Sequence, residues 1–241
     1  DRLLAGMSQD SSKKAYDFLK GMGVDIQFGK MVTDYRDHKV IMKDGSEIPT
    51  RTFLWVSGIR ANAMPGIDES HQGRGFRFKV DRYNRIDGLD GVFAIGDQCL
   101  QTTDPAYPNG HPQVAQVAIQ QAKNLAKNIK RINEGHADDN SLTPFKYNNL
   151  GSMATIGRNK AVVEIGKFHS QGFIAWILWL VVHLRSILGV KNKMMVLLNW
   201  LWKYVSYNDS IRMITYATKP REVVERMERE QTTHLGEDLM D

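Results

Sequence analysis

The sequence has a single cysteine, Cys99, among its 241 residues. One cysteine excludes an internal disulfide and fits a reducing compartment. It also excludes a zinc site built from thiolates, and the seven histidines show no metal-ligand spacing. Internal repeats and low-complexity segments are absent as well. We therefore expect neither a disulfide nor a bound metal.

No apolar run reaches the ~20 residues that a helix needs to span a bilayer. The two longest runs cover residues 173–184 and 194–205, and they hold four of the five tryptophans. Tryptophan beside short apolar helices, with Lys and Arg near them, is typical of helices that lie in the membrane interface. We therefore expect residues 173–205 to bind a membrane surface. The alternatives are a buried pair of core helices and an oligomer interface.

The dinucleotide-binding fingerprint G-x-G-x-x-G is also missing. "GMGVDI" (21–26) and "GRGFR" (73–77) lack the third glycine, and neither connects a strand to a helix. The chain starts at Asp1, without a methionine or a signal-like segment. We therefore expect the chain to be part of a longer protein.

Composition is that of an ordinary globular protein, with 42% hydrophobic and 24% charged residues. The length allows one large domain or two modest ones. The net charge of +5 is mild, and the basic residues gather between Arg185 and Arg221, where seven Lys or Arg accompany one acid. No nucleic-acid partner is expected.

Hydrophobic periodicity and turn residues predict an α/β fold. One helix is expected from Ser8 or Ser11 to Leu19, and a second over residues 112–132. The apolar side of the second helix is expected to consist of Val114, Ala115, Val117, Ala118, Ala122, Leu125, Ala126 and Ile129. The predicted strands are 24–28, a hairpin around Asp44-Gly45, 52–58, 92–97, and two strands within 145–168 around a turn at 157–159.

The stretch "GVFAIGDQC" (91–99) places Gly96 and Asp97 at the end of a predicted strand. Ligands of open α/β sheets bind at such strand ends, and a carboxylate there can accept hydrogen bonds from ribityl or ribose hydroxyls. The alternative is an ordinary turn. A helix that starts about fifteen residues later, at His111-Pro112, can return to the same place. Its partly positive N-terminus would stabilise an anionic reduced flavin.

Several segments together resemble the type II NADH dehydrogenases, which are single-subunit NADH:quinone oxidoreductases. They are "TFLWVSGIRAN", "VDRYNRIDGLDGVFAIGDQC", "HPQVAQVAIQQAKNLAKNI", "KYNNLGSMATIGRNKAVVEIG" and the tryptophan-rich tail. "FAIGD" is shared by many flavoproteins with two dinucleotide domains. The "AQVAIQQA" helix combined with this tail is specific to a much smaller group of proteins. The resemblance implies a partial two-dinucleotide-domain flavoprotein fold that lacks both fingerprints and has a C-terminal amphipathic membrane anchor.

The resemblance also divides the chain. Residues 1–60 would end the NADH-binding domain, and residues 61–170 would form the returning part of the FAD-binding domain. Residues 171–241 would supply the amphipathic anchoring helices and a charged tail. The implied location is the cytoplasmic face of the inner membrane, as a peripheral protein, and a homodimer is allowed.

Site residues follow from the same resemblance. It assigns FAD to Gly96, Asp97, Ala115, Gln116 and Val117, and it assigns NADH to Gly58. Quinone would meet Gln116, Ile119 and Gln120, with Ala115, Ala118 and Gln121 in the same "AQxAxQQ" pattern.

Helical spacing supports part of this assignment. Gln113, Gln116 and Gln120 share one helix face, where uncharged amides can hydrogen-bond quinone carbonyls. The alternative is a solvated polar face. Leu150 stands where family members often carry a lysine, so any role of that charge is missing here.

The implied activity is FAD-dependent, non-proton-pumping electron transfer from NADH to a membrane quinone, for which the chain alone would be incomplete. No acid–base pair is evident in the sequence, and no catalytic residue is assigned. The alternatives are another flavin-dependent quinone reductase, such as a sulfide:quinone oxidoreductase, a disulfide reductase, and a non-catalytic membrane-associated α/β module. A sulfide:quinone oxidoreductase and a disulfide reductase both need cysteine pairs, and the single cysteine of this chain argues against both.

Overall fold

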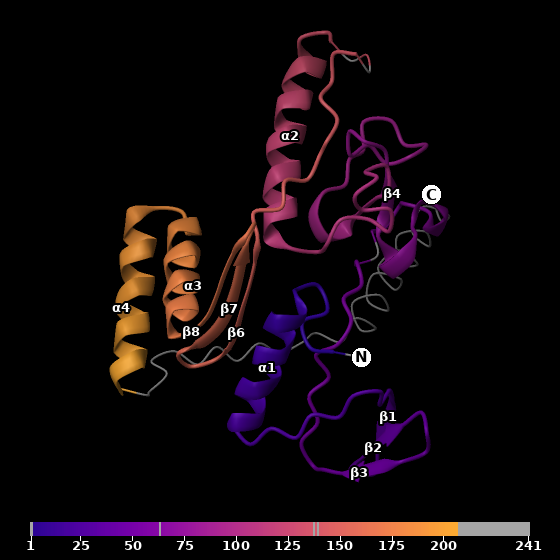
Figure 1. Ribbon diagram of the computed structural model, residues 1–241. Helices are drawn as coiled ribbons and strands as arrows, with labels where there is room; N and C mark the ends of the chain where they lie inside the picture. Colours follow the sequence, from indigo (N-terminus) through magenta and orange to yellow (C-terminus); the bar gives the residue numbers. More distant parts are fainter. Residues whose placement is uncertain (1, 63, 137, 139, 207–241) are drawn as a thin grey trace, which may run out of the picture. The chain divides into compact units, whose positions relative to one another are not determined.

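The computed structural model describes residues 2–62, 64–136, 138 and 140–206. Contacts divide the chain into two units, of which one reaches to Trp179 and the other begins at Leu180. Figure 1 shows the elements in chain order. The charged tail expected at the end of the chain lies outside the described residues.

The first helix, α1 (Gln9–Gly21), begins and ends close to the predicted residues. Ser8 is its N-cap, and the Ser8 side chain accepts a hydrogen bond from the Ser11 amide. The helix stops at Met22, and Gly23 follows with a positive φ of 83°. Local capping chemistry therefore sets both ends of α1.

The predicted hairpin is confirmed as part of a three-stranded antiparallel sheet. Its strands are β1 (Val32–Arg36), β2 (Lys39–Met42) and β3 (Glu47–Pro49), with order β1-β2-β3. Gly45 has a φ of +81°, as the turn between β2 and β3 requires. The strand predicted at 24–28 is wrong, because the first strand begins only at Val32.

Residues 52–58 and 92–97 do not form the predicted buried strands. Leu54 is 80% and Val56 94% exposed, and within the described chain no strand pairs with this run. Residues 92–97 make one isolated bridge, between Phe93 and Arg85, and then enter a 3-10 turn, η3 (Gly96–Gln98). A buried strand needs hydrogen-bonded neighbours on both sides. Residues 92–94 have one such neighbour, because Val92 accepts from the Ile86 amide and Ala94 donates to the Asn84 carbonyl, and this contact is too short to make a strand.

A small parallel pair lies next to η3. β4 (Phe78–Val80) pairs with β5 (Cys99–Gln101), after two short 3-10 turns, η1 (Glu69–His71) and η2 (Arg74–Phe76). Cys99 is 1% exposed. Its hydrophobic cluster consists of Phe78, Val80, Ile86, Ala94 and Cys99.

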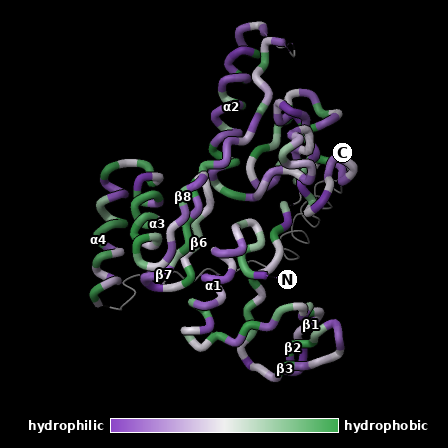
Figure 2. Tube along the Cα trace, viewed as in Figure 1, coloured by the Kyte–Doolittle hydropathy of each residue, from purple (hydrophilic) through white to green (hydrophobic). Residues whose placement is uncertain are grey.

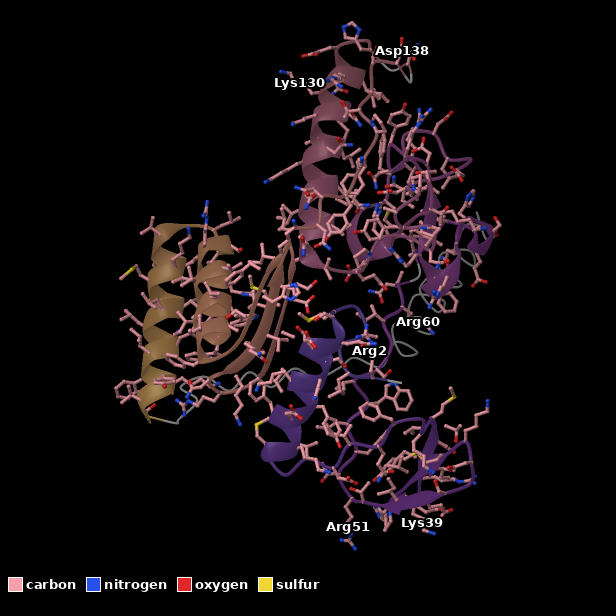
Figure 3. All side chains as sticks on the ribbon, viewed as in Figure 1. Arg2, Lys39, Arg51, Arg60, Lys130 and Asp138 are labelled. Carbon is pink, nitrogen blue, oxygen red and sulfur yellow. The ribbon has the colours of Figure 1, made fainter. Side chains whose placement is uncertain are left out.

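The second long helix, α2 (Ala115–Asn133), begins three residues after the predicted start. Its buried residues are Val117, Gln121 and Asn128, whereas Ile119 is 52% and Ile129 40% exposed. The predicted apolar side is therefore wrong for most of its members, because α2 buries a face that contains two amides. Lys130 marks the C-terminal end of this helix in Figure 3.

An antiparallel sheet follows α2 in the chain. It consists of β6 (Ser152–Gly157), β7 (Lys160–Ile165) and β8 (Phe168–Gly172), so the two predicted strands are confirmed and a third was not predicted. Asn159 takes a φ of +61° in the predicted turn. The helix α3 (Phe173–Ser186) places Ala175, which is fully buried, in one cluster with Ala161 and Val163.

Glu164 of β7 connects the sheet to the start of α1. Its carboxylate accepts hydrogen bonds from the Ser8 amide at 3.0 Å, the Ser8 hydroxyl at 2.6 Å and the Ser11 hydroxyl. Burial raises the pKa of the Glu164 carboxyl, but the hydrogen bonds from Ser11 and Ser8 outweigh it and hold the pKa below its usual 4.5. Segments more than 150 residues apart are thereby joined.

The second unit holds the end of α3 and the helix α4 (Val190–Ser206). Both helices match the predicted apolar runs. α4 has no buried residue. Among the described residues, the helices are all too short or too polar to cross a membrane.

Candidate functional site

At the predicted ligand-binding turn, the backbone of Gly96 packs closely against the helix α2. Its φ is +66°, which favours glycine, and a Cβ placed on it would lie 3.2 Å from the Cβ of Ala118 in α2. The Gly96 amide donates a hydrogen bond of 2.7 Å to Oε1 of Gln121. Gly96 therefore permits both the turn and the close packing of η3 against α2.

Asp97 lies in η3, beside the N-terminus of α2. It is exposed, and its carbonyl accepts a 3.2 Å hydrogen bond from Nε2 of Gln113. The N-cap of α2 is Val114, whose side chain makes no capping hydrogen bond. The structure thus brings Asp97 to the start of α2, where Val114 gives the first amide groups of the helix no side-chain cap. This pair of features suits a polyhydroxylated, anionic cofactor such as FAD.

Four amide side chains on α2 bind the backbone of residues 143–151, and we call them the amide ladder. They are Gln116, Gln120, Asn124 and Asn128. Gln116 donates to the Gly151 carbonyl at 2.9 Å and accepts from the Leu150 amide at 3.0 Å.

The other steps of the amide ladder repeat this arrangement. Gln120 donates to the Asn148 carbonyl at 2.9 Å and accepts from the same residue's amide at 3.0 Å. Asn128 binds both backbone groups of Thr143 at 2.9 Å, and Asn124 donates to the Thr143 carbonyl at 2.9 Å.

The amide ladder changes the interpretation of the predicted quinone-binding amides. Gln116 and Gln120 hold the chain's own backbone, and each retains a second N–H and a second oxygen lone pair. Ile119, between them in sequence, projects with 52% exposure. The sequence shows amides four residues apart on one face, but it does not show the backbone segment that they meet.

Gln121 does not line an open site. It is 1% exposed, its Oε1 accepts from Gly96, and its Nε2 donates to Sγ of Cys99 at 3.4 Å. The expectation that Gln121 contributes to a quinone site is therefore wrong. Burial raises the pKa of the Cys99 thiol, so Cys99 is a neutral hydrogen-bond partner at this position.

A buried polar cluster holds the segment that leads into α2. His111 is 2% exposed, and its Nε2 lies 3.1 Å from Oδ2 of Asp104. Burial raises the pKa of Asp104, but hydrogen bonds from His111 and the Ala106 amide outweigh it and hold the pKa below its usual 3.8. Arg77 donates to the carbonyls of Cys99 and His111. These contacts fix the entry to α2, and no motif or spacing in the sequence predicts them.

The remaining predicted positions lie at the surface. Leu150 is 61% exposed beside the Gln116 step of the amide ladder. Gly58 has a φ of +84°, and a Cβ placed on it would meet no atom within 4 Å. A positive φ, rather than a close neighbour, is what favours glycine at position 58. Within the described residues, no group of three or more His, Cys, Asp or Glu side chains is arranged to hold a metal ion.

Comparisons with known proteins point the same way as this geometry. Residues 1–122 match the family model described as pyridine nucleotide-disulphide oxidoreductase, and residues 149–206 match the NDH2 C-terminal domain. The type II NADH:quinone oxidoreductase Ndh of Mycobacterium tuberculosis is 36% identical over 216 residues, covering 85% of this chain and 44% of that protein.

A plant protein and a solved structure are also similar. The mitochondrial internal alternative NAD(P)H-ubiquinone oxidoreductase A1 of Arabidopsis thaliana is 32% identical over 208 residues, covering 81% of this chain and 40% of that protein. The structure of NDH2 from Plasmodium falciparum in complex with NADH has a TM-score of 0.75 at 15% identity, covering 88% of this chain and 57% of that one. The chain therefore spans less than half the length of these two curated relatives, and the solved structure shares its α/β fold.

Proposed function

Because the chain belongs to the pyridine nucleotide-disulphide oxidoreductase family and carries an NDH2 C-terminal domain, we propose that it is part of a type II NADH:quinone oxidoreductase. The observation that carries this proposal is the position of the Gly96-Asp97 turn beside the uncapped start of α2. FAD bound there would take a hydride from NADH and pass two electrons to a membrane quinone, without pumping protons. The segment near Gly58 would meet the NADH.

The chain's own residues would bind FAD in three ways. Gly96 lets the cofactor approach the backbone, because it carries no side chain and adopts a positive φ. Asp97 would accept hydrogen bonds from ribityl hydroxyls. The amide groups of Ala115 and Gln116, in the first turn of α2, would face the flavin ring and favour its anionic reduced form, and the backbone of Val117, whose amide donates to the Val114 carbonyl at 3.0 Å, would pack beside it.

Asp97→Ala in the full-length protein is expected to weaken FAD binding about ten- to a hundredfold. The variant loses hydrogen bonds to a charged group, which are worth about 1.5–3 kcal/mol. Flavin absorbance per protein after gel filtration measures the loss. Asp90→Ala is the matched control, because Asp90 is another exposed aspartate in a nearby turn. If the two variants retain equal flavin, Asp97 does not belong to the site.

We propose that quinone binds at the exposed side of α2, next to the amide ladder. Ile119 offers an apolar contact there, and the second N–H groups of Gln116 and Gln120 remain as donors to quinone carbonyls. None of these side chains carries a fixed charge beside the flavin. Replacement of either glutamine would also release the backbone of residues 148–151, so Ile119 is the cleaner position to test.

Ile119→Asn is expected to slow flavin reoxidation by quinone about tenfold and to leave flavin reduction by NADH unchanged. It removes an apolar contact worth about 1.5 kcal/mol or more, without breaking the amide ladder. Stopped-flow absorbance follows the two half-reactions separately. Ile129→Asn, at an exposed position toward the other end of α2, should alter neither. Equal slowing of both half-reactions would indicate a structural effect of the Ile119 change instead.

The apolar face of α4 is proposed to hold the protein at the membrane. Its exposed hydrophobic side chains are Met194, Met195, Leu198, Leu201, Trp202 and Val205. Their spacing places all of them on one side of the helix, and Figure 2 shows the hydrophobic character of α3 and α4. Such a helix lies in the lipid interface, where a lipid-soluble quinone is available. The cytoplasmic face of the inner membrane remains the proposed location, and a homodimer is the competing use of this face.

A further inference from the structure

We propose that Gln121 is the positioning residue of the flavin-binding turn. Its carboxamide accepts from the Gly96 amide at 2.7 Å and donates to Sγ of Cys99 at 3.4 Å. Gly96 is the first residue of η3, and Cys99 is its C-cap. One side chain of α2 therefore holds both ends of the turn that presents Asp97. This inference rests on the proposed flavin site, which it deepens.

The two contacts use the two halves of one carboxamide. The Gly96 amide needs an acceptor, because an unpaired backbone N–H in a buried position destabilises the fold. The thiol of Cys99 is a weak acceptor, and Nε2 is the donor that meets it. Gln121 is 1% exposed, so water does not substitute for either contact.

Burial also separates this role from a ligand-binding one. Asp97 is exposed and its backbone carbonyl accepts from Gln113, whereas the Gln121 side chain is buried and hydrogen-bonds to the two ends of the turn. Gln121 therefore acts on the cofactor through the turn. Because the turn and the start of α2 are fixed to each other by this side chain, the carboxylate and the helix amides keep one relative position.

Gln121→Met in the full-length protein removes both hydrogen bonds while it keeps the length of the side chain. We expect FAD affinity to fall about tenfold and the flavin absorption and fluorescence bands to shift. Gln121→Glu retains an oxygen for the Gly96 amide and should recover part of the affinity. Asn128→Met is the matched control, because Asn128 is also 1% exposed on α2 and binds the backbone at Thr143, far along the helix from η3. It should lower the melting temperature without changing FAD affinity.

The outcomes separate this inference from the proposed function. A wild-type protein that binds no flavin overturns both. A flavoprotein in which Gln121→Met and Asn128→Met lose FAD equally, at equal losses of melting temperature, overturns the positioning role alone. If Gln121→Met does not fold, Cys99→Ala removes the sulfur that accepts from Nε2 of Gln121 and from Nδ2 of Asn84, both at 3.4 Å, and should weaken FAD about threefold, with Cys99→Ser restoring it. Unchanged FAD affinity in Cys99→Ala would then contradict the proposal.

Discussion

Gly151→Ala is expected to unfold the β6–β8 sheet, or to lower its free energy of unfolding by roughly 3–5 kcal/mol. Gly151 has a φ of +109°, which an L-residue with a side chain rarely adopts. A Cβ there would overlap the carbonyl oxygen of Glu164 and lie 3.0 Å from Cγ1 of Ile165. The Glu164 carbonyl resists displacement, because Glu164 pairs with Ser152 in the ladder between β6 and β7.

Urea unfolding of the variant and of the wild-type protein measures the effect of the Gly151 change. Gly166→Ala, in the turn between β7 and β8, is the matched control, since Gly166 also has a positive φ, of 57°, but open space where the Cβ would lie. It should cost only about 1–2 kcal/mol of backbone strain. Equal losses at the two positions would show that the overlap with Glu164 is relieved by movement of the strand.

Removal of residues 190–241 is expected to release the protein from membranes and to abolish reduction of quinone held in a bilayer. Reduction of a water-soluble acceptor should persist. The apolar face of α4 contributes several kcal/mol of interfacial binding, so high salt should release the intact protein only in part. Flotation with lipid vesicles measures binding. The deletion starts at Val190 because Ala175 of α3 is fully buried in the cluster of β7, so that an earlier cut would open this core.

A pair of charge substitutions tests the face of α4 without a deletion. Leu198→Glu with Leu201→Glu should prevent flotation, whereas Asn199→Glu, an exposed position off the apolar face, should not. Continued binding of the deleted protein would place the membrane contact elsewhere. If the intact protein stays in solution as a dimer that the paired substitutions dissociate, the α4 face is an interface between two copies.

Elements whose determinants are local were predicted correctly from the sequence. Ser8 caps α1, Asp44-Gly45 turns the hairpin, and the apolar runs after Gly172 form α3 and α4. The family was also predicted from short motifs, and the comparisons confirm it. The buried strands predicted at residues 52–58 and 92–97 are wrong, because an apolar run becomes a buried strand only when other strands flank it.

The candidate site was predictable only in outline. Periodicity shows that Gln116 and Gln120 share a face of α2, but it cannot show whether that face meets a ligand or the backbone of residues 148–151. Adjacent glutamines in sequence, Gln120 and Gln121, turn out to have opposite surroundings, because a step of one residue rotates the side chain by about 100° around the helix axis.

The amide ladder has an evolutionary consequence. Its acceptors and donors on residues 143–151 are main-chain groups, which every amino acid except proline supplies in full. Exposed side chains in this connector, such as Lys146, can therefore change while the connector keeps its path along α2, whereas Phe145 and Tyr147 are buried in a cluster with Val117. An insertion would not be tolerated in the same way. One extra residue between Thr143 and Asn148 would displace the backbone groups to which Gln116 and Gln120 hydrogen-bond. We expect natural variants of this connector to differ at its exposed positions, to keep an apolar residue at Phe145 and Tyr147 and a glycine at Gly151, and to differ hardly at all in length.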